Sequence, residues 1–293
     1  MIEKNGLVVE GGGMKCAYSA GILDRFLDDH INFDYCIGVS AGAANTLSYL
    51  AGQRGRKLRF YTKHLDDPRY LSIHSLIHTG NLFGLQYIYG TLTNSDGADP
   101  IDYPAIMRNP SEFYMPATDA KTGCAIYFTK YDIIRDDYRT VMATCALPGF
   151  CRPVEIDGHF YYDGGVADSI PVSHALSHGC KKLVVILSNP RDFVKQPEAH
   201  RPIYKRMLRK YPNTIDSIDH RHINYQHSID LANQLEKDGT AFIFAPSRHV
   251  PLSTFSRDAA LEQELYDLGV ADYNARSAAL KQFLSTEDKK ETL

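Results

Sequence analysis

A serine set between two glycines, with a run of glycines ahead of it, is the part of this chain best suited to chemistry. The motif reads Gly38-Val39-Ser40-Ala41-Gly42. Small residues at these flanking positions allow a sharp turn from a strand into a helix, in which the backbone crosses itself and holds the hydroxyl out. An activated serine in such a turn could attack a carbonyl carbon. The alternative is an ordinary glycine-rich turn without a chemical role.

The elements on both sides of Ser40 favour the chemical interpretation. Residues 33–37 are apolar and aromatic, which is typical of a buried strand, and residues 41–50 are small and apolar with helical spacing. A strand, the motif and then a helix form the context that a nucleophilic serine requires. We therefore favour a nucleophile over an ordinary turn.

The earlier glycines could supply the donors that a reacting carbonyl needs. Gly11, Gly12, Gly13, Met14 and Lys15 lie between a strand expected over 7–9 and a helix expected over about 15–29. Backbone N–H groups without side chains can approach a substrate oxygen closely, and the start of a helix adds partial positive charge. The loop lacks the Gly-Lys-Ser/Thr ending of a nucleotide P-loop. The dinucleotide pattern would need a glycine where Cys16 stands, so we favour an oxyanion loop over both phosphate-binding loops.

The base that would activate Ser40 is less obvious. An ordinary α/β-hydrolase places several strands before its nucleophile and uses a histidine, whereas only about 40 residues precede Ser40. None of the twelve histidines lies in a distinctive motif, and their close pairs have no evident third ligand, so we expect no metal site. Asp163, followed by Gly164 and Gly165, comes directly after a strand-like segment and is the better candidate. The alternative for Asp163 is a solvated turn.

The glycine loop at 11–15, the serine motif at 38–42 and the Asp-Gly-Gly at 163–165 follow one another in the order seen in the patatin-like phospholipases, a family of lipid acyl hydrolases that they resemble. The segments 118–123, 143–149 and 168–172 are also similar to the family, and the resemblance covers about residues 5–190. It implies a Ser–Asp dyad, with Ser40 as nucleophile and Asp163 as base, which would explain the missing histidine. It also implies oxyanion donors in Gly11 to Met14, positive charge from Lys15, and no metal or other cofactor. Cys16 departs from the family, which usually has a glycine there.

The resemblance further implies an α/β fold with three layers, α/β/α, around a mainly parallel central sheet. The sequence agrees, because strand, helix, strand, helix begins a parallel sheet with helices on its faces. We expect a catalytic core over 1–190 and a helical and strand extension over 191–293 packed on the same domain. Segments with expected secondary structure are strands at 113–115, 125–128, 154–156, 159–162, 182–187 and 241–244, and helices at 215–237 and 258–284. Residues 53–112 are less regular, and we expect loops that shape a substrate site there.

Composition narrows the environment and the partners. Hydrophobic residues make up 44%, charged residues 23%, and the net charge is −3, which gives no reason to expect nucleic acid as a partner. No apolar run approaches the ~20 residues that span a bilayer. The first residues carry no secretion signal, and six scattered cysteines suggest reduced thiols. We therefore expect a cytoplasmic protein.

The expected partner is a lipid ester, which raises the question of contact with membranes. Residues 191–211 hold seven Lys or Arg against two acids, and Tyr204, Leu208 and Tyr211 form an apolar stripe. This segment is either a basic helix that touches the inner membrane surface transiently or a helix packed on the sheet with a solvated basic face. Two functional alternatives to a hydrolase stay open: transfer of the acyl group to another acceptor, and a lipid-binding regulatory protein without catalysis. The oligomeric state is left open.

Overall fold

A single eight-stranded sheet forms the centre of the molecule, in a computed structural model that describes residues 4–199 and 201–285. The strand order is β5-β6-β3-β2-β1-β7-β8, with β4 paired to β3. The strand bounds are β1 Lys4–Val9, β2 Tyr35–Gly38, β3 Glu112–Asp119, β4 Ala125–Thr129, β5 Val154–Ile156, β6 His159–Asp163, β7 Cys180–Ile186 and β8 Ala241–Phe244. All expected strands are present at the expected places.

The sheet is mainly parallel. Strands β3, β2, β1, β7 and β8 run in one direction, whereas β4, β5 and β6 join as antiparallel strands at the β3 edge. The expected fold class, α/β with a mainly parallel central sheet, is confirmed. Because β2 ends at Gly38 and the antiparallel β6 ends at Asp163, both ends must be brought together by β3, which pairs with both strands.

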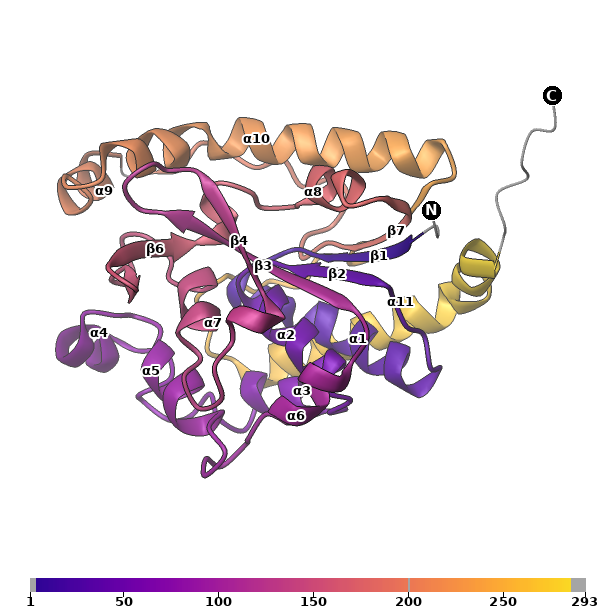
Figure 1. Cartoon of the computed structure of the whole chain (residues 1–293), viewed down its shortest axis with the longest axis horizontal. Coiled ribbons are helices and arrows are strands. Elements are labelled where there is room, and N and C mark those ends of the chain that lie inside the picture. Colours follow the sequence, from indigo (N-terminus) through magenta and orange to yellow (C-terminus); the bar gives the residue numbers. More distant parts are fainter. Residues whose placement is uncertain (1–3, 200, 286–293) are drawn as a thin grey trace.

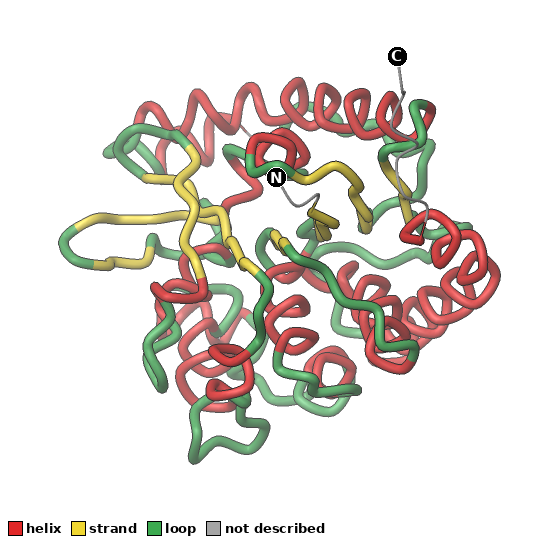
Figure 2. Tube along the Cα trace, turned by 45° about the vertical axis from the view of Figure 1, so that its right-hand side comes forward, coloured by secondary structure: helices red, strands yellow, loops and turns green. Residues whose placement is uncertain are grey.

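Helices cover both faces of the sheet (Figure 1). One face packs against α8 (Val172–Ser177) and α10 (Pro212–Lys237), and the other against α1 (Ala17–Asp28), α2 (Ala41–Leu50) and α11 (Ala259–Ser285). Alternate side chains of the buried strands enter the two cores: Leu7 and Val9 point to the α1 side, and Val8 to the α10 side. The view turned by 45° keeps the strands between two sets of helices (Figure 2).

Residues 53–112 are more helical than the sequence indicated. They form α3 (Arg56–Tyr61), α4 (Ile73–Thr79), α5 (Leu85–Tyr87) with a following π-helical turn, and α6 (Tyr103–Arg108). These helices are short, so their hydrophobic periodicity is too brief to stand out in the sequence. The same holds for α7 (Arg139–Thr144) and α8, which the sequence analysis did not identify.

The C-terminal third adds to the same sheet and core. Strand β8 pairs in parallel with β7, and α11 packs along α1 through glycines on both helices. A Cβ on Gly21 would lie 2.3 Å from the carbonyl oxygen of Tyr266, and one on Gly269 would lie 2.3 Å from that of Tyr18. The division of the chain at about residue 190 into core and extension stays a prediction. Among the described residues, no helix is long and apolar enough to cross a membrane.

Candidate active site

Ser40 lies in a sharp turn between the end of β2 and the start of α2. Its φ of +54° is in the left-handed region, which is uncommon for a residue with a Cβ and marks local strain. The flanking glycines are required by close packing: a Cβ on Gly38 would lie 2.7 Å from the Cα of Ala43, and one on Gly42 would lie 2.5 Å from the carbonyl oxygen of Glu10. The motif therefore forms the strained turn that its spacing predicts.

Thr144, at the end of α7, fixes the backbone of this turn. The backbone N–H of Ser40 donates to the hydroxyl oxygen of Thr144 over 3.1 Å. The Thr144 hydroxyl in turn donates to the carbonyl oxygen of Pro116 in β3 over 2.5 Å. The Thr144 side chain, which is fully buried, thereby ties the Ser40 turn to the strand between β2 and β6.

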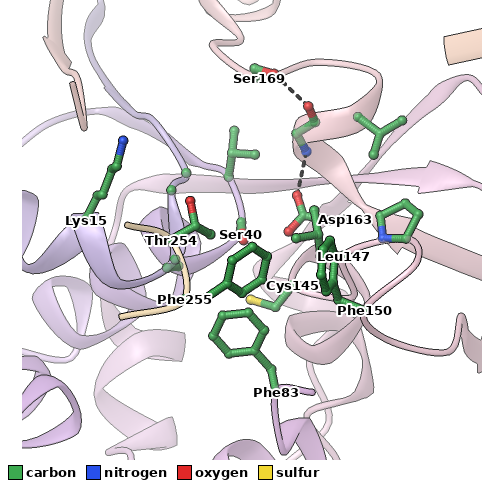
Figure 3. A pocket seen from close by; sticks show the side chains of 18 of the residues that line it. Lys15, Ser40, Phe83, Cys145, Leu147, Phe150, Asp163, Ser169, Thr254 and Phe255 are labelled. Carbon is green, nitrogen blue, oxygen red and sulfur yellow. Dashed lines mark hydrogen bonds between the residues drawn. The ribbon is translucent and has the colours of Figure 1, made fainter. Parts of the chain in front are cut away.

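Asp163 ends β6 and faces Ser40 across the site (Figure 3). One carboxylate oxygen accepts a hydrogen bond of 2.7 Å from the backbone N–H of Gly165, and the nearby hydroxyl of Ser40 lowers the pKa of the carboxyl. Asp163 is 5% exposed, and burial raises the pKa of its carboxyl above the usual value despite the lowering effects of Ser40 and Gly165. A buried carboxylate with a raised pKa, in contact with a hydroxyl, is able to accept its proton.

The glycines after Asp163 leave room for a neighbouring cation. A Cβ on Gly164 would lie 2.0 Å from the carbonyl oxygen of Pro116, and one on Gly165 would lie 3.2 Å from a guanidinium nitrogen of Arg221. Arg221, on α10, donates to the carbonyl oxygen of Gly165 over 2.5 Å and to Glu198 over 3.0 Å. Its positive charge lowers the pKa of Asp163 and opposes part of the effect of burial.

The glycine loop runs beside Ser40. A Cβ on Gly11 would lie only 3.0 Å from the Cβ of Ser40. Within residues 4–199 and 201–285, the N–H groups of Gly11 and Gly12 have no hydrogen-bond partner, so they are free to bind an oxygen. The N–H of Met14 differs, because it donates to the carbonyl oxygen of Thr254 over 3.3 Å.

Lys15 points away from Ser40 in Figure 3 and belongs to a buried polar cluster. Its ammonium donates to Asn189 over 2.8 Å, and Asn189 contacts Glu10. Burial raises the pKa of Glu10 to about 7 and lowers that of Lys15. Cys16 is fully buried at the start of α1 with its thiol near the hydroxyl of Ser188, and burial raises its pKa to about 12, so it occupies the glycine position as an unreactive group.

A cavity of about 600 Å³ contains Ser40, Asp163 and the glycine loop. Aromatic and aliphatic side chains from the α3–α5 region line one side, and charged residues from the segment before α9 (Arg201–Met207) and from α10 line the other. Phe255 contacts the rings of Phe83 and Phe150 at centroid distances of 5.7 and 4.5 Å, and the three rings lie over the site in Figure 3. The cavity is thus largely apolar and partly covered by aromatic rings, which suits a lipid chain.

The structure brings together Ser40, Asp163 and the glycines 11 and 12 in one cavity. Two contributors escaped the sequence analysis: Thr144, which lies in the family-like segment 143–149 without a chemical signature, and Arg221. No sequence signal connects Arg221 to Asp163, because α10 reaches the site only through folding. Among the described residues, no group of three or more His, Cys, Asp or Glu is placed to hold a metal ion.

Comparison with known proteins adds independent information. The family model of patatin-like phospholipases matches residues 7–176, and a domain of unknown function, DUF6363, matches residues 211–285. The uncharacterized protein YjjU of Escherichia coli (strain K12) is 30% identical over 279 residues, which cover 90% of this chain and 74% of YjjU. Among solved structures, VipD from Legionella pneumophila aligns with a TM-score of 0.43 and 14% identity, covering 93% of this chain and 67% of VipD.

Proposed function

Because the chain belongs to the patatin-like phospholipase family, we propose that it hydrolyses acyl esters of lipids with Ser40 as nucleophile and Asp163 as base. One observation supports this assignment most strongly. The Ser40 hydroxyl lies near the buried carboxylate of Asp163 and beside two backbone N–H groups that have no partner among the described residues, inside a cavity that suits a lipid chain. Nucleophile, base and oxyanion donors are the three parts that acyl transfer to a serine requires.

The reaction would proceed through an acyl-serine. Asp163 takes the hydroxyl proton as the Ser40 oxygen attacks the ester carbonyl carbon, and the negative charge that develops on the carbonyl oxygen is held by the N–H groups of Gly11 and Gly12. The C–O bond to the alcohol then breaks, and Asp163 returns the proton to the departing oxygen. A water molecule repeats the sequence on the acyl-serine and releases the carboxylic acid. Lys15 would add positive charge near the loop, although its ammonium is engaged with Asn189.

Product analysis tests this proposal and separates it from acyl transfer. Purified protein is incubated with a panel of phospholipids and neutral lipid esters, with and without added alcohol or thiol acceptors. We expect free fatty acid from the wild type and none from Ser40→Ala or Asp163→Asn. Acyl-acceptor products in place of fatty acid would favour a transferase. A folded wild type that binds lipid but turns over no ester would favour a non-catalytic lipid-binding protein.

We also propose that the cavity mouth rests on an anionic lipid surface. Ile203 and Met207, on α9, line the cavity and are 59% and 57% exposed. Phe150 lines it too, and its carbonyl oxygen accepts a hydrogen bond from Leu82, just after α4. Helix α4 carries further exposed aliphatic side chains and lies at the same end of the molecule as α9 (Figure 1).

The charge around α9 suits anionic headgroups. Lys205, Arg206, Arg209 and Lys210 are exposed, and none of them forms an ion pair with a described residue. The stripe of Tyr204, Leu208 and Tyr211 packs instead against α10, so it belongs to the protein core. The basic residues that the sequence analysis singled out are thus exposed, whereas the apolar residues that would enter the lipid are Ile203 and Met207.

Vesicle binding tests this second proposal. Each basic side chain near an anionic membrane contributes about 1 kcal/mol, so replacing Lys205, Arg206, Arg209 and Lys210 by Glu should abolish cosedimentation with vesicles that contain phosphatidylglycerol. Ile203→Glu with Met207→Glu should weaken binding to the same vesicles. Unchanged binding in both variants would contradict membrane contact through α9.

A further inference from the structure

Lys57 is a buried lysine in the wall of the cavity, and no described residue offers it a polar partner. It is 6% exposed and lines the same cavity as Ser40. Its ammonium lies over the rings of Phe60 and Tyr61, at 4.6 and 5.6 Å from their centroids, but makes no hydrogen bond or ion pair with any residue that the structure describes. Burial, with the charge of Arg56, lowers the pKa of Lys57 to about 7. Such a group is costly for the fold unless something binds it.

The neighbouring cation shows what a satisfied buried group looks like in this helix. Arg56 is 3% exposed, yet its guanidinium donates to the carbonyl oxygen of Asp99 and to the hydroxyls of Ser48 and Thr93. The Asp99 carboxylate lies 3.7 Å from Arg56 and 2.7 Å from Arg59, so one negative charge serves two positive ones. The charge near Lys57 is therefore positive on balance, which favours an anion as its partner.

Lys57 lies on the apolar side of the cavity that also holds the reacting serine. Tyr61, Tyr70 and Tyr89 line this side and are near enough to affect one another's pKa. Cys145 lines the same cavity, with its thiol 3.3 Å from the hydroxyl of Tyr89, and both Lys57 and Ser40 are near enough to lower the pKa of this thiol, which burial raises to about 12. An acyl chain bound to Ser40 and directed to this side would pass the ammonium.

We propose that Lys57 makes this side of the cavity a binding site for acyl chains that carry a carboxylate, so that the preferred esters are those of dicarboxylic acids. The inference rests on the proposed ester hydrolysis and specifies its substrate class. A plain alkyl chain would leave the ammonium unpartnered in a dry cavity, whereas a chain with a terminal carboxylate would supply an ion pair where water is largely excluded. Hydrogen bonds to charged groups in such surroundings are the stronger ones.

Two esters of equal chain length test the proposal. The kcat/KM values for p-nitrophenyl octanoate and mono-p-nitrophenyl suberate are measured with wild type and Lys57→Met, and spontaneous hydrolysis is subtracted with Ser40→Ala. We expect wild type to prefer the suberate ester by about 10-fold or more. Lys57→Met should lower kcat/KM for the suberate ester by about 10- to 100-fold and leave the octanoate value equal or higher. Equal use of both esters by wild type, or an equal loss for both in Lys57→Met, would overturn the proposal.

The matched control is Lys195→Met. Lys195 lines the opposite side of the cavity, but its ammonium is paired with Glu198 at 3.1 Å, so the variant should leave the ratio between the two esters unchanged. Calorimetric binding of free suberate and free octanoate separates this inference from the proposed hydrolysis. Tighter binding of suberate that is lost in Lys57→Met supports the site even if no ester is turned over. Equal binding of both acids refutes the site even if esters are hydrolysed.

Discussion

Gly11→Ala tests whether the glycine loop acts through its closeness to Ser40. The φ of Gly11 lies outside the left-handed region, so an alanine is not strained by its backbone conformation. Its Cβ, however, would lie 2.9 Å from the carbonyl oxygen of Val39 and 3.0 Å from the Cβ of Ser40. Ordinary contacts of this kind begin at 3.4 Å, so the loop must withdraw by about 0.5 Å (3.4 minus 2.9).

That shift is large for an oxyanion donor. Such donors act when they lie ~2.7–3.1 Å from the developing charge, and removing one costs about 10²–10³ in kcat, or ~2.7–4 kcal/mol. We therefore expect Gly11→Ala to lower kcat for p-nitrophenyl octanoate by about 100-fold or more. The melting temperature should change little, because an alanine also lowers the entropy of the unfolded chain, which stabilises the folded state by ~0.4–1 kcal/mol.

Gly52→Ala is the control for the assay. A Cβ on Gly52 would meet nothing within 4 Å, although its φ of +68° makes an alanine strained by ~1–2 kcal/mol. This variant should lose some stability and keep its kcat, which is the opposite of what we expect for Gly11→Ala. A Gly11→Ala protein with wild-type kcat would refute the assignment of the loop to oxyanion binding.

Further variants probe the base, the ring cover and the unpartnered lysine. The wild-type kcat/KM should fall as the pH drops through the raised pKa of Asp163, because the base must be ionised. Arg221→Gln removes a cation that lowers this pKa. As the pH drops, the variant should therefore lose activity at a higher pH than wild type does. Phe255→Ala should lower the KM for bulky esters in steady-state assays, because it removes a ring that contacts Phe83 and Phe150 over the cavity. An unchanged KM would show that the ring does not limit the entry of the ester. Lys57→Met should stabilise the fold by about 1–3 kcal/mol in thermal or urea denaturation. The pKa of Lys57 is about 7 in the folded state and usually 10.5, so the gain in the free energy of unfolding should be largest below pH 7 and vanish by about pH 10.5. A gain independent of pH would contradict a buried ammonium.

The strands could be predicted from the sequence because they depend on short-range patterns, and the candidate site could be proposed from patterns of the same kind. A buried strand and a small-residue helix around Ser40 are visible in consecutive residues, and the glycines at 11, 38 and 42 are required by contacts that their spacing already suggests. Asp163 could be proposed from its place at a strand end beside two glycines. Its burial and its contact with Ser40 could not, since they depend on β6 pairing with β3.

The residues that were missed act through long-range contacts. Arg221, on α10, reaches the loop after Asp163 although it lies 56 residues after Gly165 in the chain. Lys57 looks like an ordinary member of a basic stretch, and only packing shows that it is buried while Arg56 beside it is paired. Likewise, Tyr204, Leu208 and Tyr211 have the spacing of a membrane-facing stripe, but α10 already covers them.

Covalent labelling with a fluorophosphonate tests the central claim most directly, because the probe reacts only with an activated serine. Intact-mass analysis and peptide mapping of wild type, Ser40→Ala and Asp163→Asn would report the extent and the position of the label. We predict one label on Ser40 in the wild type, none in Ser40→Ala, and much slower labelling in Asp163→Asn. A folded wild type that stays unlabelled, or a Ser40→Ala protein labelled as fast as the wild type, would contradict the Ser40–Asp163 dyad.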